Sequence, residues 1–120
     1  MLLQSWPEEL TVCRLSDASD TPAEGLCFLS RTDEEISLVC ESRYVPGTCV
    51  DREDGWRAFR VAGVLDFSLI GILARITALL AEEKIGVFVV STYNTDYVLV
   101  RKERFAEALN KLQSVGYGIA

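Results

Sequence analysis

The stretch Trp56–Tyr97, WRAFRVAGVLDFSLIGILARITALLAEEKIGVFVVSTYNTDY, decides the fold of this 120-residue chain. A short apolar segment at 58–61 leads through a turn at 65–68 into a stretch whose apolar residues recur every three or four positions. A second apolar segment at 87–90 then leads through the polar turn 91–96 into a third. Strand, helix, strand and strand are therefore expected in this order, which indicates the α+β class.

The first expected helix, residues 68–83, has one apolar side and two candidate N-caps. Its apolar stripe consists of Leu69, Ile72, Leu73, Ile76, Leu79 and Leu80. Asp66 or Ser68 can cap its start, because a short side-chain oxygen accepts from free backbone N–H groups. A second helix is expected at 103–114, with Gly116 as its stop. The whole order predicts a ferredoxin-like βαββαβ unit, whose short C-terminus suggests that a strand is exchanged between the two halves of the chain.

The first 55 residues predict a smaller copy of the same unit. Strands are expected at 10–15, 26–30 and 35–40, a loose arm at 1–9 and a connector at 42–55. Residues 29–39 and 90–100 share one pattern: the end of an apolar strand, a serine, a polar turn, an acidic residue and a further strand. The two segments are 61 residues apart, which indicates an internal repeat. Only ten polar residues, 16–25, replace the long helix. Two tandem units are expected, a degenerate one at 1–55 and a complete one at 56–120.

Composition argues against several classes of function. The net charge of −6 disfavours nucleic-acid binding. No apolar run approaches the roughly 18 residues that span a bilayer, and no signal peptide opens the chain, so a cytoplasmic protein without membrane association is expected. The chain has no histidine and no nucleophile or phosphate-binding motif, so no catalytic residue, metal or cofactor is expected.

Four cysteines lie in the first half of the chain, and none has CxxC spacing. They are Cys13, Cys27, Cys40 and Cys49. Their spacing and the expected reducing compartment favour buried free thiols. A four-cysteine zinc site and disulfides are the alternatives.

Polar groups concentrate at the start of the first helix and in the 91–96 turn. A helix start offers free N–H groups to a carboxylate, and Gly71 there allows a close approach. Asp96 can pair with an ammonium or guanidinium group. The candidate ligand-binding residues are Asp66, Phe67, Ser68, Gly71, Ser91, Thr92, Asn94 and Asp96. The structural alternative is that these residues cap the helix, allow packing and satisfy turn backbone.

Three segments of the second half resemble the ACT domain. They are Leu65–Ala74, Leu80–Glu82 and Ser91–Val100. In detail they are similar to small ACT-domain proteins related to the CASTOR arginine sensors and to aspartate kinase regulatory domains. Many ACT domains have glycine where the first helix ends, whereas this chain has Lys84. Lys84 is therefore strained if its backbone is left-handed.

The resemblance implies a regulatory fold without catalysis that binds an amino acid between two ACT units. One half-site per chain is visible, so a homodimer is expected to complete the site, and a regulated protein is expected as a further partner. Two hypotheses follow. The chain is either an amino-acid sensor or a structural or protein-interaction module with a vestigial ligand site.

Overall fold

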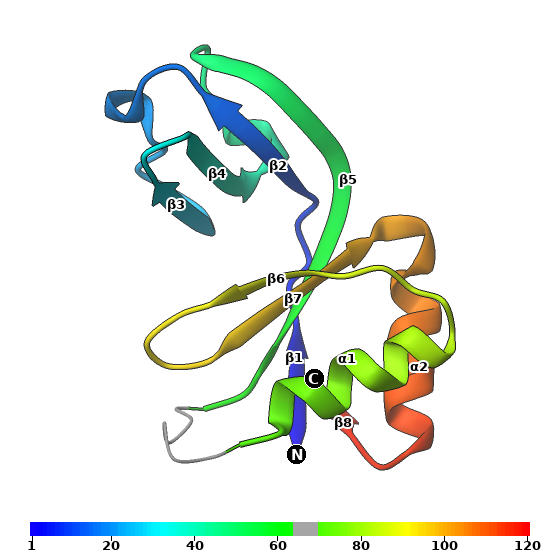
Figure 1. The fold of residues 1–120 in the computed structure, drawn as a ribbon. Helices are drawn as coiled ribbons and strands as arrows, with labels where there is room; N and C mark the ends of the chain where they lie inside the picture. Colours follow the sequence, from blue (N-terminus) through cyan, green and yellow to red (C-terminus); the bar gives the residue numbers. More distant parts are fainter. Residues whose placement is uncertain (64–69) are drawn as a thin grey trace. The chain divides into compact units, whose positions relative to one another are not determined.

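The computed structural model describes residues 1–63 and 70–120, which form two compact units (Figure 1). The C-terminal unit consists of Met1–Pro7 and Arg57–Ala120, and the N-terminal unit consists of Glu8–Trp56. Strand β5 (Cys49–Val61) runs from one unit into the other. The first seven residues thus belong with the second half of the chain, whereas the expected division placed them in the first. No helix of the described residues is long and apolar enough to cross a bilayer.

The C-terminal unit has a mixed sheet and two helices. After β5 its elements are α1 (Ile72–Glu82), β6 (Phe88–Ser91), β7 (Asp96–Arg101), the 3₁₀ turn η3 (Lys102–Arg104), α2 (Phe105–Ser114) and β8 (Gly118–Ile119). The strand order is β6-β7-β5-β1-β8, where β1 is Leu2–Ser5. Strand β1 pairs with β8 in parallel fashion, whereas β1 pairs with β5 and β6 pairs with β7 in antiparallel fashion. The α+β class and the order of elements expected from the sequence are confirmed.

Strand β1 corrects the expectation that residues 1–9 form a loose arm. It lies between β5 and β8, and its Leu3 is opposite Val61 and fully buried. A strand from the start of the chain therefore completes the sheet that the two-residue β8 could not complete alone. The sequence signal was weak because four residues are too few to show a clear alternation.

Both helices pack on one core. The buried members of this core include Leu3, Phe59, Val61, Ile76, Leu80, Val98, Val100, Phe105, Ala108 and Leu112. Helix α1 begins at Ile72, later than expected, and its N-cap is Gly71 in the left-handed region with a φ of 82°. The N-cap position of α1 is thus held by Gly71. Asp66 and Ser68, the two N-caps suggested by the sequence, lie outside the described part of the chain.

The two helices end in the same way. The N–H of Ile85 donates to the carbonyl of Leu80, and the N–H of Tyr117 donates to that of Leu112. Each bond closes the helix around one residue with positive φ, which is Lys84 at 58° and Gly116 at 107°. The stop at Gly116 and the left-handed backbone at Lys84 are confirmed.

Strand β6 is less buried than its apolar sequence suggested. Residues 87–90 were expected to be buried on both faces, but Phe88, Val89 and Val90 are half-buried and Val87 is exposed. The reason is position, since β6 pairs only with β7 and lies at an edge of the described sheet.

The N-terminal unit is an antiparallel sheet in the order β3-β4-β2-β5. Its further elements are β2 (Leu10–Leu15), the 3₁₀ turn η1 (Ala18–Asp20), β3 (Cys27–Arg31), β4 (Ile36–Glu41) and the 3₁₀ turn η2 (Ser42–Tyr44). The strand expected at 10–15 is confirmed, and the other two are shifted by one residue.

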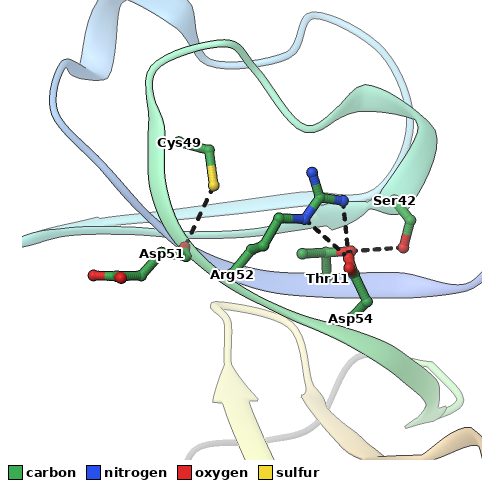
Figure 2. Close-up of polar contacts among 6 residues, drawn as sticks. All are labelled: Thr11, Ser42, Cys49, Asp51, Arg52 and Asp54. Atoms are coloured by element: carbon green, nitrogen blue, oxygen red, sulfur yellow. Dashed lines mark hydrogen bonds and ion pairs between the residues drawn. The ribbon is translucent and has the colours of Figure 1, made fainter.

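The segment 42–55, expected to be a connector, becomes a strand at Cys49. Its charged residues pair with β2, where polar partners meet them (Figure 2). Thr11 Oγ1 donates to Asp54 Oδ1 over 2.6 Å, and Arg52 Nη2 donates to the same oxygen over 2.9 Å. The run of charges resembles a linker in the sequence because a cross-strand partner such as Thr11 is far away in the chain.

The four cysteines are free and gather in one apolar cluster of the N-terminal unit. The expected burial is confirmed for Cys13 and Cys40, whereas Cys27 and Cys49 are half-buried. Burial raises the pKa of the Cys13 thiol to about 11 and that of Cys40 to about 12. Both thiols are therefore protonated at neutral pH.

The hairpins β3–β4 and β6–β7 have the same backbone pattern. In one turn the N–H of Thr32 donates to the carbonyl of Glu35 over 2.9 Å, and in the other Thr92 donates to Thr95 over 2.8 Å. A 3₁₀ turn follows each hairpin directly. Strand β7 begins 60 residues after β4, so the hairpins match at an offset of 60 and not 61. The offset of 61 aligns Ser30 with Ser91, whereas the residues that make equivalent hydrogen bonds are Thr32 and Thr92.

Candidate functional site

The turn between β6 and β7 is fixed by its two threonines. Thr92 Oγ1 donates to the carbonyl of Thr95 over 2.9 Å, which adds to the backbone bond between the same residues. Thr95 is buried, and its Oγ1 donates to the carbonyl of Val61 over 2.7 Å. The turn is thereby tied to the end of β5.

A cavity of about 280 Å³ lies against this turn, and we call it the turn pocket. It is lined by Gln4, Arg60, Gly63, Thr92, Asn94, Thr95 and Tyr97. All of these residues belong to the C-terminal unit. Two of them, Thr92 and Asn94, are among the candidate ligand-binding residues from the sequence.

Arg60 is held at the pocket by neighbours on both sides. Its Nε donates to Gln4 Oε1 over 3.0 Å, and its Nη1 donates to the hydroxyl of Tyr97 over 2.8 Å. Gln4 is its direct partner across β1 and β5. The guanidinium carbon also lies 5.7 Å from the ring centre of Tyr97 and 5.9 Å from that of Trp6. These contacts fix the position of the charge.

The charged group of the turn pocket is a cation. Among the residues that the structure describes, Arg60 is the only charged one that lines it. No acidic side chain in the described part of the chain forms an ion pair with Arg60. A planar guanidinium with unused donors is suited to a carboxylate.

Asp96 and Ser91 lie beside the pocket and do not line it. They are partners across β6 and β7, and Ser91 Oγ donates to Asp96 Oδ1 over 2.6 Å. Asp96 stands between Thr95 and Tyr97, which both line the pocket. Because neighbouring side chains of a strand alternate between faces, Asp96 belongs to the other face.

Gly71 lines a separate cavity of about 350 Å³ at the start of α1. Its other lining residues are Met1, Ile70, Ile72, Arg75, Val115, Gly116 and Tyr117. No described residue lines both cavities, so the structure does not join Gly71 to the 91–96 turn within one chain. The candidates Asp66, Phe67 and Ser68 lie outside the described residues.

The sequence analysis missed five residues that line the turn pocket: Gln4, Arg60, Gly63, Thr95 and Tyr97. A signal for Arg60 was present, because it is a charged residue between Phe59 and Val61 in an apolar strand. No signal pointed to Gln4, because its strand was not expected.

Comparisons with known proteins place this geometry in a family. A model of the ACT domain matches residues 51–114. A search of curated proteins gives no match. Among solved structures, protein Atu0741 from Agobacterium tumefaciens is similar with a TM-score of 0.87 and 28% identity, over 99% of this chain and 91% of that one.

Two further structures share the fold at lower identity. Protein VC0802 from Vibrio cholerae has a TM-score of 0.70 and 20% identity, over 92% of this chain and 85% of its own. The regulatory subunit of aspartate kinase from Thermus thermophilus has a TM-score of 0.64 and 8% identity, over 93% and 95%. The match to the ACT model covers more than half of the sequence, from β5 to the end of α2. The chain therefore belongs to the ACT domain family.

Proposed function

We propose that this ACT-domain regulatory module binds an L-amino acid at the β6–β7 turn, catalyses no reaction itself and passes the signal to a partner protein. The observation that carries the proposal is the turn pocket, because it combines a fixed cationic group with neutral hydrogen-bonding side chains. Ligand sites in proteins have this character, in which a few placed polar groups fix the orientation of the ligand.

The size of the pocket favours a small ligand. A volume of about 280 Å³ lies near the lower end of the range for ligand pockets, roughly 300–1,000 Å³. Thr92 and Asn94 are exposed at the turn and can donate to a ligand or accept from it.

The second part of the proposal is a homodimer with the ligand between two ACT units. Within one chain, the cavity that Gly71 lines is separate from the turn pocket. A ligand that contacts both the turn pocket and a helix start therefore needs the helix start of a second copy. Asp66, Phe67 and Ser68 belong to the proposed helix-start group. Ser91 and Asp96 stay in the proposal as polar side chains beside the pocket. Because Asp96 belongs to the other face of β7, its carboxylate would contact only a part of the ligand that extends past the edge of the turn. The degenerate ACT-like nature of residues 1–55 is also part of this proposal.

The test is a thermal-shift screen of the twenty L-amino acids, followed by titration calorimetry of each amino acid that shifts the transition. A ligand of the native state adds RT ln(1 + [L]/Kd) to stability, which is about 2.7 kcal/mol at a hundred times Kd. Light scattering with and without the amino acid then tests the dimer. If no amino acid stabilises the protein at millimolar concentration, the amino-acid sensor is rejected.

One observation favours the alternative, an interaction module with a vestigial site. Large apolar side chains are exposed in the C-terminal unit beside or within the helix-start cavity: Met1, Leu2, Ile70 and Val115. Exposed apolar groups of this kind mark contact surfaces in many proteins. A dimer that forms without any amino acid, in a protein that binds none, would support this alternative.

A further inference from the structure

We infer that the turn pocket receives the ligand's side chain and that Arg60 selects an acidic one, so the bound amino acid is L-aspartate or L-glutamate. This inference rests on the proposed function and adds the class of ligand to it. It concerns a residue of β5 that the sequence analysis did not select.

The first argument is the unspent hydrogen-bonding capacity of Arg60. A guanidinium has five N–H donors, and two hydrogen bonds from this one go to Gln4 and Tyr97. None of its other N–H groups donates to a described residue. The neighbours that fix the guanidinium are both neutral, so they orient the charge without cancelling it.

The second argument is the charge of the surroundings. The described residues of the lining include no aspartate or glutamate, so a basic side chain in the pocket would meet Arg60 without a counter-ion from them. A carboxylate would instead form charge-assisted bonds to a donor that is already in place. Asparagine and glutamine match aspartate and glutamate in shape and lack the charge, which makes them the appropriate reference ligands.

Arg60 also links β1, β5 and β7, so replacing it alone would not separate ligand binding from folding. Asn94 provides an independent way to change the charge of the pocket. It lines the same cavity and is exposed at the turn, so Asn94→Asp places a carboxylate in the same pocket as the guanidinium with little change of shape. Arg31→Gln is the matched control, because Arg31 is an exposed arginine of the N-terminal unit that lines neither cavity.

The experiment measures Kd by calorimetry for L-aspartate, L-asparagine, L-glutamate, L-glutamine, L-arginine and inorganic phosphate. The parent protein and the variants Arg60→Gln, Asn94→Asp and Arg31→Gln are compared, and the melting temperature of each is recorded. We expect the parent to bind at least one acidic amino acid about tenfold more tightly than its amide, the scale that separates a charge-assisted from a neutral hydrogen bond. Arg60→Gln and Asn94→Asp should remove most of this preference for the acid over its amide, and Arg31→Gln should keep it.

Several results would overturn the inference. If an amide binds as well as its acid, or if L-arginine or phosphate binds best, Arg60 does not select an acidic side chain. If Asn94→Asp keeps the parent's preference for the acid over its amide, the inference is rejected as well. This result is decisive even if Arg60→Gln does not fold. An amino acid that binds without a preference for acids leaves the proposed function standing and rejects the role of Arg60. If no amino acid binds the parent, the proposed function fails as well.

Discussion

In the β3–β4 turn three acidic side chains are exposed, Asp33, Glu34 and Glu35. The equivalent positions of the β6–β7 turn hold Tyr93, Asn94 and Thr95, none of which is charged. The backbone hydrogen bond of the two turns is the same. The same backbone thus carries acidic side chains in one turn and uncharged ones in the other. The hairpin is a structural frame, and the ligand site that we propose depends on the side chains and strands around it.

The surroundings of the two turns differ as well. The side chain of Thr95 is buried and reaches the carbonyl of Val61, whereas Glu35 is exposed. The C-terminal unit also has two helices and the strand β1, which contributes Gln4 to the turn pocket. The N-terminal unit has only 3₁₀ turns in addition to its strands. The predictions below change these differences one at a time.

The largest effect is expected from the strand that the C-terminal unit takes from the start of the chain. Leu3→Ala should lower the free energy of unfolding by about 2–5 kcal/mol, because it leaves a cavity in a fully buried site. Leu2→Ala is the control on the same strand, since Leu2 is 45% exposed and should change stability far less. Urea denaturation measures both. Equal, small effects would mean that residues 2–5 are a loose arm after all.

The next effect concerns the bond that ties the β6–β7 turn to β5. Thr95→Val keeps the shape of the side chain but leaves the buried carbonyl of Val61 without this donor. We expect a loss of about 1–3 kcal/mol, the cost of an unsatisfied buried group. Glu35→Ala, at the equivalent position of the other turn, should stay within about 0.5 kcal/mol. If Thr95→Val and Glu35→Ala lose the same amount of stability, the hydrogen bond from Thr95 does not distinguish the β6–β7 turn from the β3–β4 turn.

The smallest effect is expected at the ends of the helices. Lys84→Gly should raise stability by up to about 1 kcal/mol, because glycine adopts a φ of 58° without steric strain. Gly116→Ala should lower it by a similar amount, since its φ is 107°. Thermal denaturation of both variants checks the pair. A gain of stability in Gly116→Ala would contradict a left-handed backbone at Gly116, where α2 ends.

Much of the fold could be predicted because its signals are local. The apolar stripe of α1, the stop at Gly116 and strand 10–15 all follow from periodicity and turn chemistry within short windows. Strand β1 and the first half of β5 could not be predicted, because their stability comes from partners far away in the chain. Leu3 meets Val61, and Thr11 meets Asp54.

The candidate site shows the same limit. Thr92 and Asn94 were selected because the 91–96 turn is a local pattern, and both line the turn pocket. Gln4, Arg60 and Tyr97 come from three strands that meet only in the folded sheet. Asp96 was selected for its charge, yet strand alternation assigns it to the face away from the pocket.

The proposed amino-acid site is tested most directly by an NMR titration of the ¹⁵N-labelled protein with L-aspartate and L-glutamate. The backbone amide resonances of residues that line the turn pocket should change their chemical shifts and reach a plateau as the ligand saturates the site. These residues are Gln4, Arg60, Thr92, Asn94 and Tyr97. The amides of the equivalent turn at 32–35 should stay unchanged and serve as the internal control. Saturable shifts at 32–35, or shifts confined to the residues around Arg75, would contradict the assignment of the ligand site to the β6–β7 turn.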